Sequence, residues 1–199
     1  MISVSLTTFV DFVSKAGTPK FTVVRKWKNK EPYSPATDFY KKVRDEIVDI
    51  HENARPVSEL DRLLSDLRDN RRLENYPEVI YGYKRWLGRK QPSWFPPPAA
   101  TWNYEDLGIQ VNPELGLEID GQPHLIKLYF KSEPLTKNRV ELITHLMSVA
   151  CTEKLPTNCR MGVLDVRQSK LITPTVPVSG LTAQLQAEAS YWLAAWPAA

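Results

Sequence analysis

Residues 107–131 of this 199-residue chain, LGIQVNPELGLEIDGQPHLIKLYFK, carry its strongest structural signal. Apolar and polar residues alternate along three short runs, which is the period-two pattern of β-strands. The runs cover residues 107–111, 115–119 and 124–131. Asn112-Pro113 turns the chain after the first run, and Asp120-Gly121 is a strong hairpin signal after the second. The stretch therefore predicts three strands that follow one another as a meander.

The segments before this meander are mainly helical in pattern. Apolar residues recur at helical spacing in three of them, which cover residues 35–53, 57–67 and 76–88. Ser34-Pro35 and Tyr76-Pro77 are typical helix starts, and Gly88 is a typical stop. Closer to the N-terminus, residues 2–14 fit a short helix or a strand, and Phe21–Val24 reads as a strand.

After the meander the pattern alternates between helix and strand. A helix is predicted from Leu135-Thr136 to Ala150, and a second helix from Ser179-Gly180 to Ala195. Between them, residues 161–166 form a predicted fourth strand that could pair with Leu171-Ile172. The expected fold class is α+β. A central mixed sheet combines the three-strand meander with the fourth strand, and a helix lies between these strands in the chain. N-terminal helices and a C-terminal helix flank the sheet.

The expected organisation is one compact domain with three parts. Residues 1–90 form a basic, mainly helical portion that packs on the core, residues 91–104 a proline-rich connector, and residues 105–199 the sheet-containing core. With 42% hydrophobic and 25% charged residues, the composition excludes a collagenous, disulfide-rich or disordered chain. No run of about 18 apolar residues and no secretory signal pattern is found, so we expect no membrane association and a cytoplasmic location.

Positive charge is concentrated in the first half of the chain. Residues 1–100 hold 18 Lys+Arg against 13 Asp+Glu, whereas residues 101–199 hold 8 against 10. Two basic clusters with interleaved aromatic residues stand out. The first contains Lys20, Arg25, Lys26, Lys28 and Lys30, with Phe21 and Trp27. The second contains Arg71, Arg72, Lys84, Arg85, Arg89 and Lys90, with Tyr81, Tyr83, Trp86 and Trp94.

Such interleaving suits a nucleic-acid groove, because cations neutralise phosphates and aromatic rings stack on bases. It also suits solvated faces of helices and strands whose aromatic residues pack inward. We take the second cluster as the candidate nucleic-acid-binding residues. The C-terminal Trp192 and Trp196 suggest a protein partner as an alternative, or a tail tucked onto the domain.

The order helix, three strands, helix, strand over residues 35–172 resembles the core of the PD-(D/E)xK, or restriction-endonuclease-like, nuclease superfamily. In that family two acidic residues on neighbouring strands bind Mg²⁺, and a lysine on the second strand activates or orients the attacking water. Pro113-Glu114 stands where the family has Pro-Asp, and Lys127 follows thirteen residues later. The position two before the lysine, which is acidic in the family, is Leu125 here.

The resemblance implies a site with Lys127 and Glu118 as catalytic residues, and with Glu114, Glu118 and Asp120 as ligands of Mg²⁺. Glu46 or Asp49, in the first long helix, could also supply the acid that Leu125 lacks. Three hypotheses stay open. The chain could be a Mg²⁺-dependent nuclease, a non-catalytic binding or assembly subunit with the same fold, or another α+β domain whose Glu118 and Asp120 merely face solvent.

Overall fold

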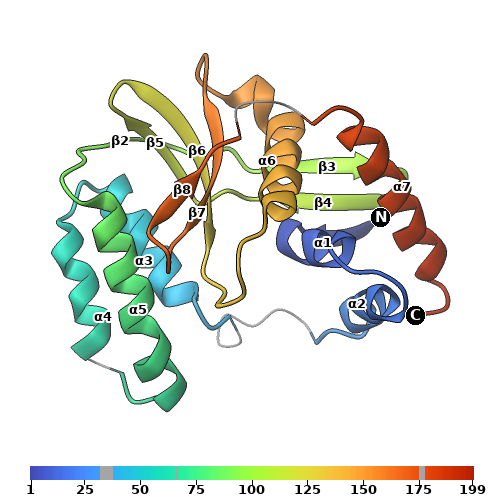
Figure 1. Ribbon diagram of the computed structural model, residues 1–199, viewed down its shortest axis with the longest axis horizontal. Helices are drawn as coiled ribbons and strands as arrows, with labels where there is room; N and C mark the ends of the chain where they lie inside the picture. The colour runs from blue at the N-terminus through green and yellow to red at the C-terminus, as the bar shows by residue number, and fades with distance from the viewer. Residues whose placement is uncertain (32–37, 66, 175–177) are drawn as a thin grey trace.

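A computed structural model describes residues 1–31, 38–65, 67–174 and 178–199 (Figure 1). The strands are β1 (Ile2–Ser5), β2 (Ser93–Phe95), β3 (Ala100–Tyr104), β4 (Leu107–Val111), β5 (Leu115–Ile119), β6 (Gln122–Tyr129), β7 (Arg160–Asp165) and β8 (Lys170–Ile172). The helices are α1 (Leu6–Val13), α2 (Thr18–Lys28), α3 (Lys41–Glu52), α4 (Arg62–Ser65), α5 (Asn70–Leu87), α6 (Lys137–Cys151) and α7 (Leu181–Ala195). Short 3₁₀ turns cover Val57–Asp61 and Thr152–Lys154.

The strands form two sheets. Five strands in the order β2-β5-β6-β7-β8 make a mixed sheet in which only β6 and β7 run parallel. The other three, in the order β1-β4-β3, make a smaller sheet. The predicted α+β class, with a mixed sheet and flanking helices at both ends of the chain, is confirmed.

The predicted three-strand meander is only partly right. β5 and β6 form the expected hairpin, in which Asp120 and Gly121 have φ of +51° and +76°. β4 instead pairs with β1 and β3 in the smaller sheet. Pro113 disfavours a two-residue hairpin between β4 and β5, because its ring fixes φ near −65° whereas such a turn needs positive φ.

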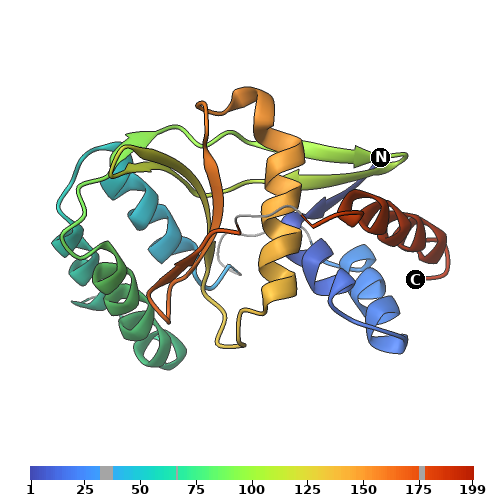
Figure 2. The ribbon, with the colours of Figure 1, turned by 45° about the horizontal axis from the view of Figure 1, so that its top comes forward.

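Two hydrophobic cores cover the two faces of the five-stranded sheet (Figures 1 and 2). On one face, α3, α5 and the turn Val57–Asp61 bury Leu115, Leu117 and Ile126. On the other face, α6 covers Leu125 and Val163, and α1, α7 and the smaller sheet complete that core. Because neighbouring residues of β6 point to opposite faces, Lys127 shares the face of Leu125, and it lies just beyond the last residue that pairs with β5.

Three sequence-based expectations for the N-terminal half need correction, and a fourth falls outside the described residues. Phe21–Val24 is not a strand but part of α2, where Pro19 occupies the first turn and favours a helix start. α5 begins earlier than Tyr76-Pro77, because the Asp69 side chain accepts from the Arg72 backbone N–H at 3.0 Å and caps the helix. Within the helix predicted over residues 57–67, Val57–Asp61 is a 3₁₀ turn and Arg62–Ser65 is α4. The Ser34-Pro35 helix start lies outside the described residues.

Other expectations agree with the structure. Residues 2–14 supply both β1 and α1, α6 and α7 lie where helices are predicted, and β7 pairs with β8. Gly88 ends α5 with φ of +52°. The proline-rich connector, in contrast, contains two strands that the sequence does not predict: β2 at the edge of the large sheet and β3 in the smaller one. Across the described ranges, no helix combines the length and apolar character that crossing a membrane requires.

Candidate functional site

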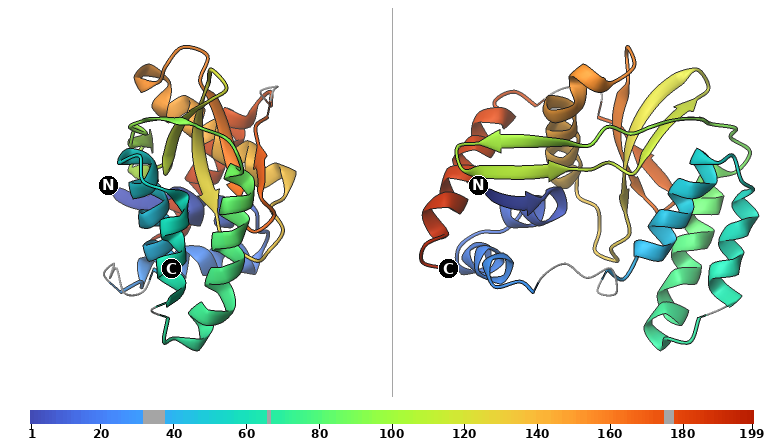
Figure 3. Two further views of the ribbon diagram at one scale, coloured as in Figure 1. Left: turned by 90° about the vertical axis from the view of Figure 1, so that its left-hand side faces the viewer. Right: turned by 180° about the vertical axis from the view of Figure 1, so that it is seen from behind.

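A cavity of about 990 Å³ lies where α1, α2 and α3 meet the β4–β5 corner and β6. Figure 1 and the right-hand view of Figure 3 both show α2 and α3 on opposite sides of the end of β6. The described lining residues are Ser5, Thr7, Thr8, Trp27, Lys30, Glu31, Asp38, Arg44, Asn112, Pro113, Glu114 and Lys127. Three cations and three carboxylates thus face one space, which makes this cavity the candidate site.

Glu114 and Lys127 form an ion pair on the sheet side of the cavity. The hairpin pairs Leu115 with Ile126, so the next residues along, Glu114 and Lys127, stand opposite each other. Lys127 Nζ lies 2.5 Å from Glu114 Oε1 and donates to the Asn112 carbonyl at 2.8 Å. The Leu128 backbone N–H donates to Glu114 Oε2 at 2.8 Å. Both carboxylate oxygens of Glu114 are therefore engaged by groups of the protein.

Arg44 and Asp38 form a second ion pair on the helical side, with Arg44 Nη2 2.7 Å from Asp38 Oδ2. Burial lowers the pKa of Arg44, but the hydrogen bond and charge of Asp38, together with the charge of Glu114, raise that pKa above its ordinary value. Glu114 thus acts electrostatically on Arg44 as well as on Lys127. The four side chains form a row of alternating charges across the cavity.

The N-terminus of α1 adds neutral polar groups to the cavity. Ser5 caps this helix, since its Oγ accepts from the Thr8 backbone N–H at 3.2 Å. The same hydroxyl donates to Thr8 Oγ1 at 2.8 Å, and Thr7 lines the cavity next to them. Hydroxyls are hydrogen-bond donors and acceptors that a charged ligand can use without competing against an ion pair.

The C-terminal part of α2 forms the basic rim of the cavity. Trp27 and Lys30 line the cavity, and the Trp27 Nε1–H donates to the Ser3 carbonyl at 2.9 Å. Lys30 Nζ lies 4.4 Å from the centroid of the Trp27 ring. Arg25 and Lys26 are exposed on the same helix. The first basic cluster of the sequence, and not the second, is therefore the one next to the Glu114–Lys127 pair.

The structure does not bring the predicted metal ligands together. Glu118 and Asp120 are exposed, and Glu118 stands opposite Pro123, four residues from Lys127 along β6. At ~3.3 Å per residue, that spacing separates their backbones by about 13 Å. Leu125 is fully buried in the core beneath α6. Among the residues that the structure describes, no three His, Cys, Asp or Glu side chains are grouped so that they could hold a metal ion.

The residues present consequently do not fit the Mg²⁺ site that the family resemblance implies. Mg²⁺ requires several hard oxygen ligands in near-octahedral geometry. Glu114 offers the one carboxylate on the sheet side of the cavity lining that the structure describes, and its oxygens already accept from Lys127 and Leu128. The place of the second acid is taken by the Leu125 side chain, which belongs to the core.

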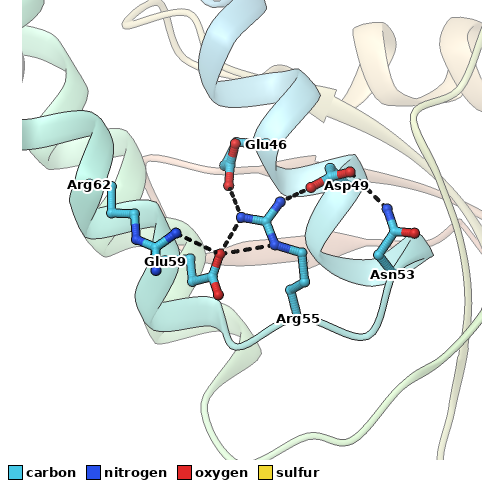
Figure 4. Close-up of polar contacts among 6 residues, drawn as sticks. All are labelled: Glu46, Asp49, Asn53, Arg55, Glu59 and Arg62. Carbon is cyan, nitrogen blue, oxygen red and sulfur yellow. Dashed lines mark hydrogen bonds and ion pairs between the residues drawn. The ribbon is translucent and has the colours of Figure 1, made fainter.

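Glu46 and Asp49, the alternative acids, have a different role (Figure 4). Both form ion pairs with Arg55, which also pairs with Glu59 in the 3₁₀ turn after α3. Arg62 adds a longer contact to Glu59 at 3.3 Å. These carboxylates tie the end of α3 to the following turn, so neither is directed to Lys127.

The second basic cluster lies on and after α5, and none of its residues is among the described residues of the cavity lining. Tyr83 and Trp86 are buried in the core, as the inward-packing interpretation expects, whereas Tyr81 is 53% exposed. Lys84 forms an ion pair with Asp61, and Lys90 Nζ donates to the Trp86 carbonyl. The remaining cations of this cluster are Arg71, Arg72, Arg85 and Arg89, and their predicted contact with nucleic acid stays a prediction.

The C-terminal tryptophans are held by the domain. Trp192 is fully buried, and Trp196 packs against the same core. Lys28 Nζ donates to the Trp196 and Pro197 carbonyls at 2.9 and 3.3 Å. The tucked arrangement therefore agrees with the structure: Trp192 is buried, and Trp196 is half-buried against the same core.

Comparison with known proteins found similar solved structures, among them two of LHK-Exo. One is LHK-Exo in complex with dAMP, with a TM-score of 0.44 and 11% sequence identity. The other is an alkaline exonuclease (LHK-Exo) from Laribacter hongkongensis, with a TM-score of 0.41 and 12% identity. Both alignments cover 98% of this chain and 88% of the other. No family model and no curated protein matches the sequence.

Proposed function

We propose that this protein binds the phosphate backbone of nucleic acid at the cavity between α1, α2, α3 and β6, using its own cations and no divalent metal. It is then a binding protein on a nuclease-like scaffold and not a Mg²⁺-dependent nuclease. The observation that carries the proposal is the Glu114–Lys127 pair. The Lys127 ammonium lies 2.5 Å from Glu114 Oε1. To act as a ligand of a metal ion, that carboxylate oxygen would have to be free of this contact.

The basic rim of α2 supports the binding part of the proposal. Arg25, Lys26 and Lys30 are exposed, and no carboxylate of the described chain is within ion-pair distance of any of them. All three lie within about one helical turn of Trp27, a distance shorter than the Debye length of about 8 Å at physiological salt. Lys30 lines the cavity, and the charges of Arg25 and Lys26 on the adjoining helical turn add to its attraction for a polyanion.

The row of charges inside the cavity supports the same function. Arg44 presents a planar set of N–H donors that matches phosphate geometry, and its ion pair with Asp38 fixes the position of the guanidinium. The hydroxyls of Ser5, Thr7 and Thr8 supply further hydrogen bonds. A phosphate that enters the cavity meets donors already held in place, which lowers the entropic cost of binding.

The salt dependence of binding tests this proposal. For a single strand, log K falls with log [salt] with a slope of about −0.7 for each phosphate neutralised. The triple variant Arg25→Gln/Lys26→Gln/Lys30→Gln should flatten the slope by about 2. The matched control Arg71→Gln/Arg85→Gln/Arg89→Gln removes three exposed cations from α5 and its end, and should leave the slope unchanged.

Measurement by fluorescence anisotropy in EDTA over a range of KCl concentrations gives both slopes. Absence of binding at low salt would overturn the proposal. The proposal would also be overturned if the α5 triple variant flattened the salt slope and the α2 triple variant left it unchanged. That result would place the interface at the second basic cluster.

A further inference from the structure

We infer that the nucleic acid taken up by this cavity is single-stranded, and that one of its bases stacks on the indole of Trp27. This inference rests on the proposed function and names its ligand more closely. The juxtaposition behind it is an oriented tryptophan in the wall of a charged cavity, next to an exposed lysine and within reach of the Arg44 and Lys127 side chains.

The orientation of the Trp27 ring is fixed by two contacts. Its Nε1–H donates to the Ser3 carbonyl of β1 at 2.9 Å, and part of the ring packs against the core that α1 and α6 share. Such a ring cannot turn away when a ligand arrives. A stacking platform of this kind loses little conformational entropy on binding.

The free face of the ring is identified by Lys30. Its ammonium lies 4.4 Å from the ring centroid, and Lys30 is itself exposed. The face that carries this cation therefore opens to the cavity and not to the core. A lysine side chain is flexible, so the Lys30 ammonium can leave the ring for a neighbouring phosphate while a base takes its place over the indole.

The dimensions of the cavity favour a single strand over a duplex. Its volume of about 990 Å³ is at the upper end of the range of about 300–1,000 Å³ that is typical of small-ligand pockets. A pocket of this size accommodates individual nucleotides. The base faces of a duplex are covered by their stacked neighbours, so a base must be unpaired to reach Trp27. Aromatic platforms beside cationic grooves are the usual means of binding single strands without sequence preference.

A cycle that combines a protein variant with a modified ligand tests the inference. The ligands are a fluorescein-labelled ten-residue thymidine oligonucleotide and its abasic counterpart, which keeps the phosphates and lacks the bases. The proteins are the wild type and Trp27→Leu, which keeps an apolar side chain against the core. Thermal melting of the variant checks that it is folded, and Trp27→Phe is the conservative variant that keeps a stacking ring.

Wild-type protein should bind the thymidine oligonucleotide about tenfold more tightly than the abasic one, within the range measured for base–aromatic stacking. Trp27→Leu should bind both ligands equally and with the wild-type affinity for the abasic oligonucleotide. Trp27→Phe should recover part of the difference. A duplex of the same length should bind the wild type more weakly than the single strand.

Equal binding of the two oligonucleotides by the wild type would overturn the inference, and so would a duplex that binds as tightly as the single strand. Either result leaves the proposed function standing, provided that the salt slope still depends on the α2 cations. Loss of all binding in EDTA at low salt would instead refute the proposed function itself, and the two failures can therefore be distinguished.

Discussion

Removal of the Lys127 charge is the perturbation that best probes the interior of the site. In Lys127→Met the aliphatic length of the side chain is kept, but the ammonium that faces Glu114 is lost. The side chains of Lys127 and Glu114 are only 15% and 10% exposed, so water cannot fully replace the lost partner. The Leu128 backbone N–H still donates to Glu114 Oε2, and this single hydrogen bond compensates the carboxylate only in part.

Breaking a buried ion pair on one side typically costs about 3–5 kcal/mol. Because both side chains keep some contact with water, we expect the lower end, about 3 kcal/mol, in the free energy of unfolding. For a chain of this length that corresponds to a fall in Tm of roughly 6–12 °C. The double variant Lys127→Met/Glu114→Gln should lose less than Lys127→Met alone, since its neutral amide oxygen still accepts from Leu128.

Urea unfolding followed by circular dichroism and by tryptophan fluorescence measures these differences, and coincidence of the two probes checks two-state behaviour. The double-mutant cycle then gives the coupling between the two side chains. A Lys127→Met variant as stable as the wild type, or a double variant that is less stable than Lys127→Met, would refute the assignment of Lys127 as the counter-ion of Glu114.

Two further predictions concern stability. Burial lowers the pKa of His51 from its ordinary value to about 4, so between pH 6.5 and about 4 the unfolded chain binds a proton that the folded chain does not. Stability should therefore fall with decreasing pH across this window, by up to about 1.4 kcal/mol per pH unit from this group. Urea unfolding at several pH values should show a flatter stability profile for His51→Phe than for the wild type. Identical profiles would count against the partly buried position of His51. A Cβ at Gly82 of α5 would lie 2.1 Å from the Val166 carbonyl oxygen, so Gly82→Ala should lose about 1–3 kcal/mol although alanine favours helices. Tyr81→Ala, at an exposed neighbouring position, is the control, and an unchanged Tm of Gly82→Ala would contradict the close packing of α5 on the β7–β8 turn.

Much of the fold follows from local sequence signals. The hairpin at Asp120-Gly121 could be predicted because few residues adopt the positive φ that such a turn requires. Helix α6 could be predicted because Thr136 caps it and its apolar residues keep one stripe. α2 could not, since Phe21–Val24 consists of residues that favour strands. The helix is favoured there because Val24 packs in the core and Pro19 stands in the first turn.

The site was only partly within reach of the sequence. Glu114 and Lys127 do come together, but the metal role expected for Glu118 and Asp120 gains no geometric support. A two-residue turn at Asp120-Gly121 fixes the register, which places Glu114 opposite Lys127 and Glu118 opposite Pro123. The turn that fixes this register can be read from the sequence. The proximity of Trp27 and Lys30 to the Glu114–Lys127 pair cannot be read from it, because it depends on how α2 packs against the smaller sheet.

The central claim is that the cavity binds nucleic acid with protein cations in place of a divalent metal. The most direct measurement is the affinity of the wild type for a labelled single strand in EDTA and in Mg²⁺ or Mn²⁺ at matched ionic strength, with the length of the strand checked on a denaturing gel afterwards. We predict the same dissociation constant in all three conditions and an intact strand. Affinity that requires the metal, or metal-dependent cleavage that Lys127→Met abolishes, would contradict the account.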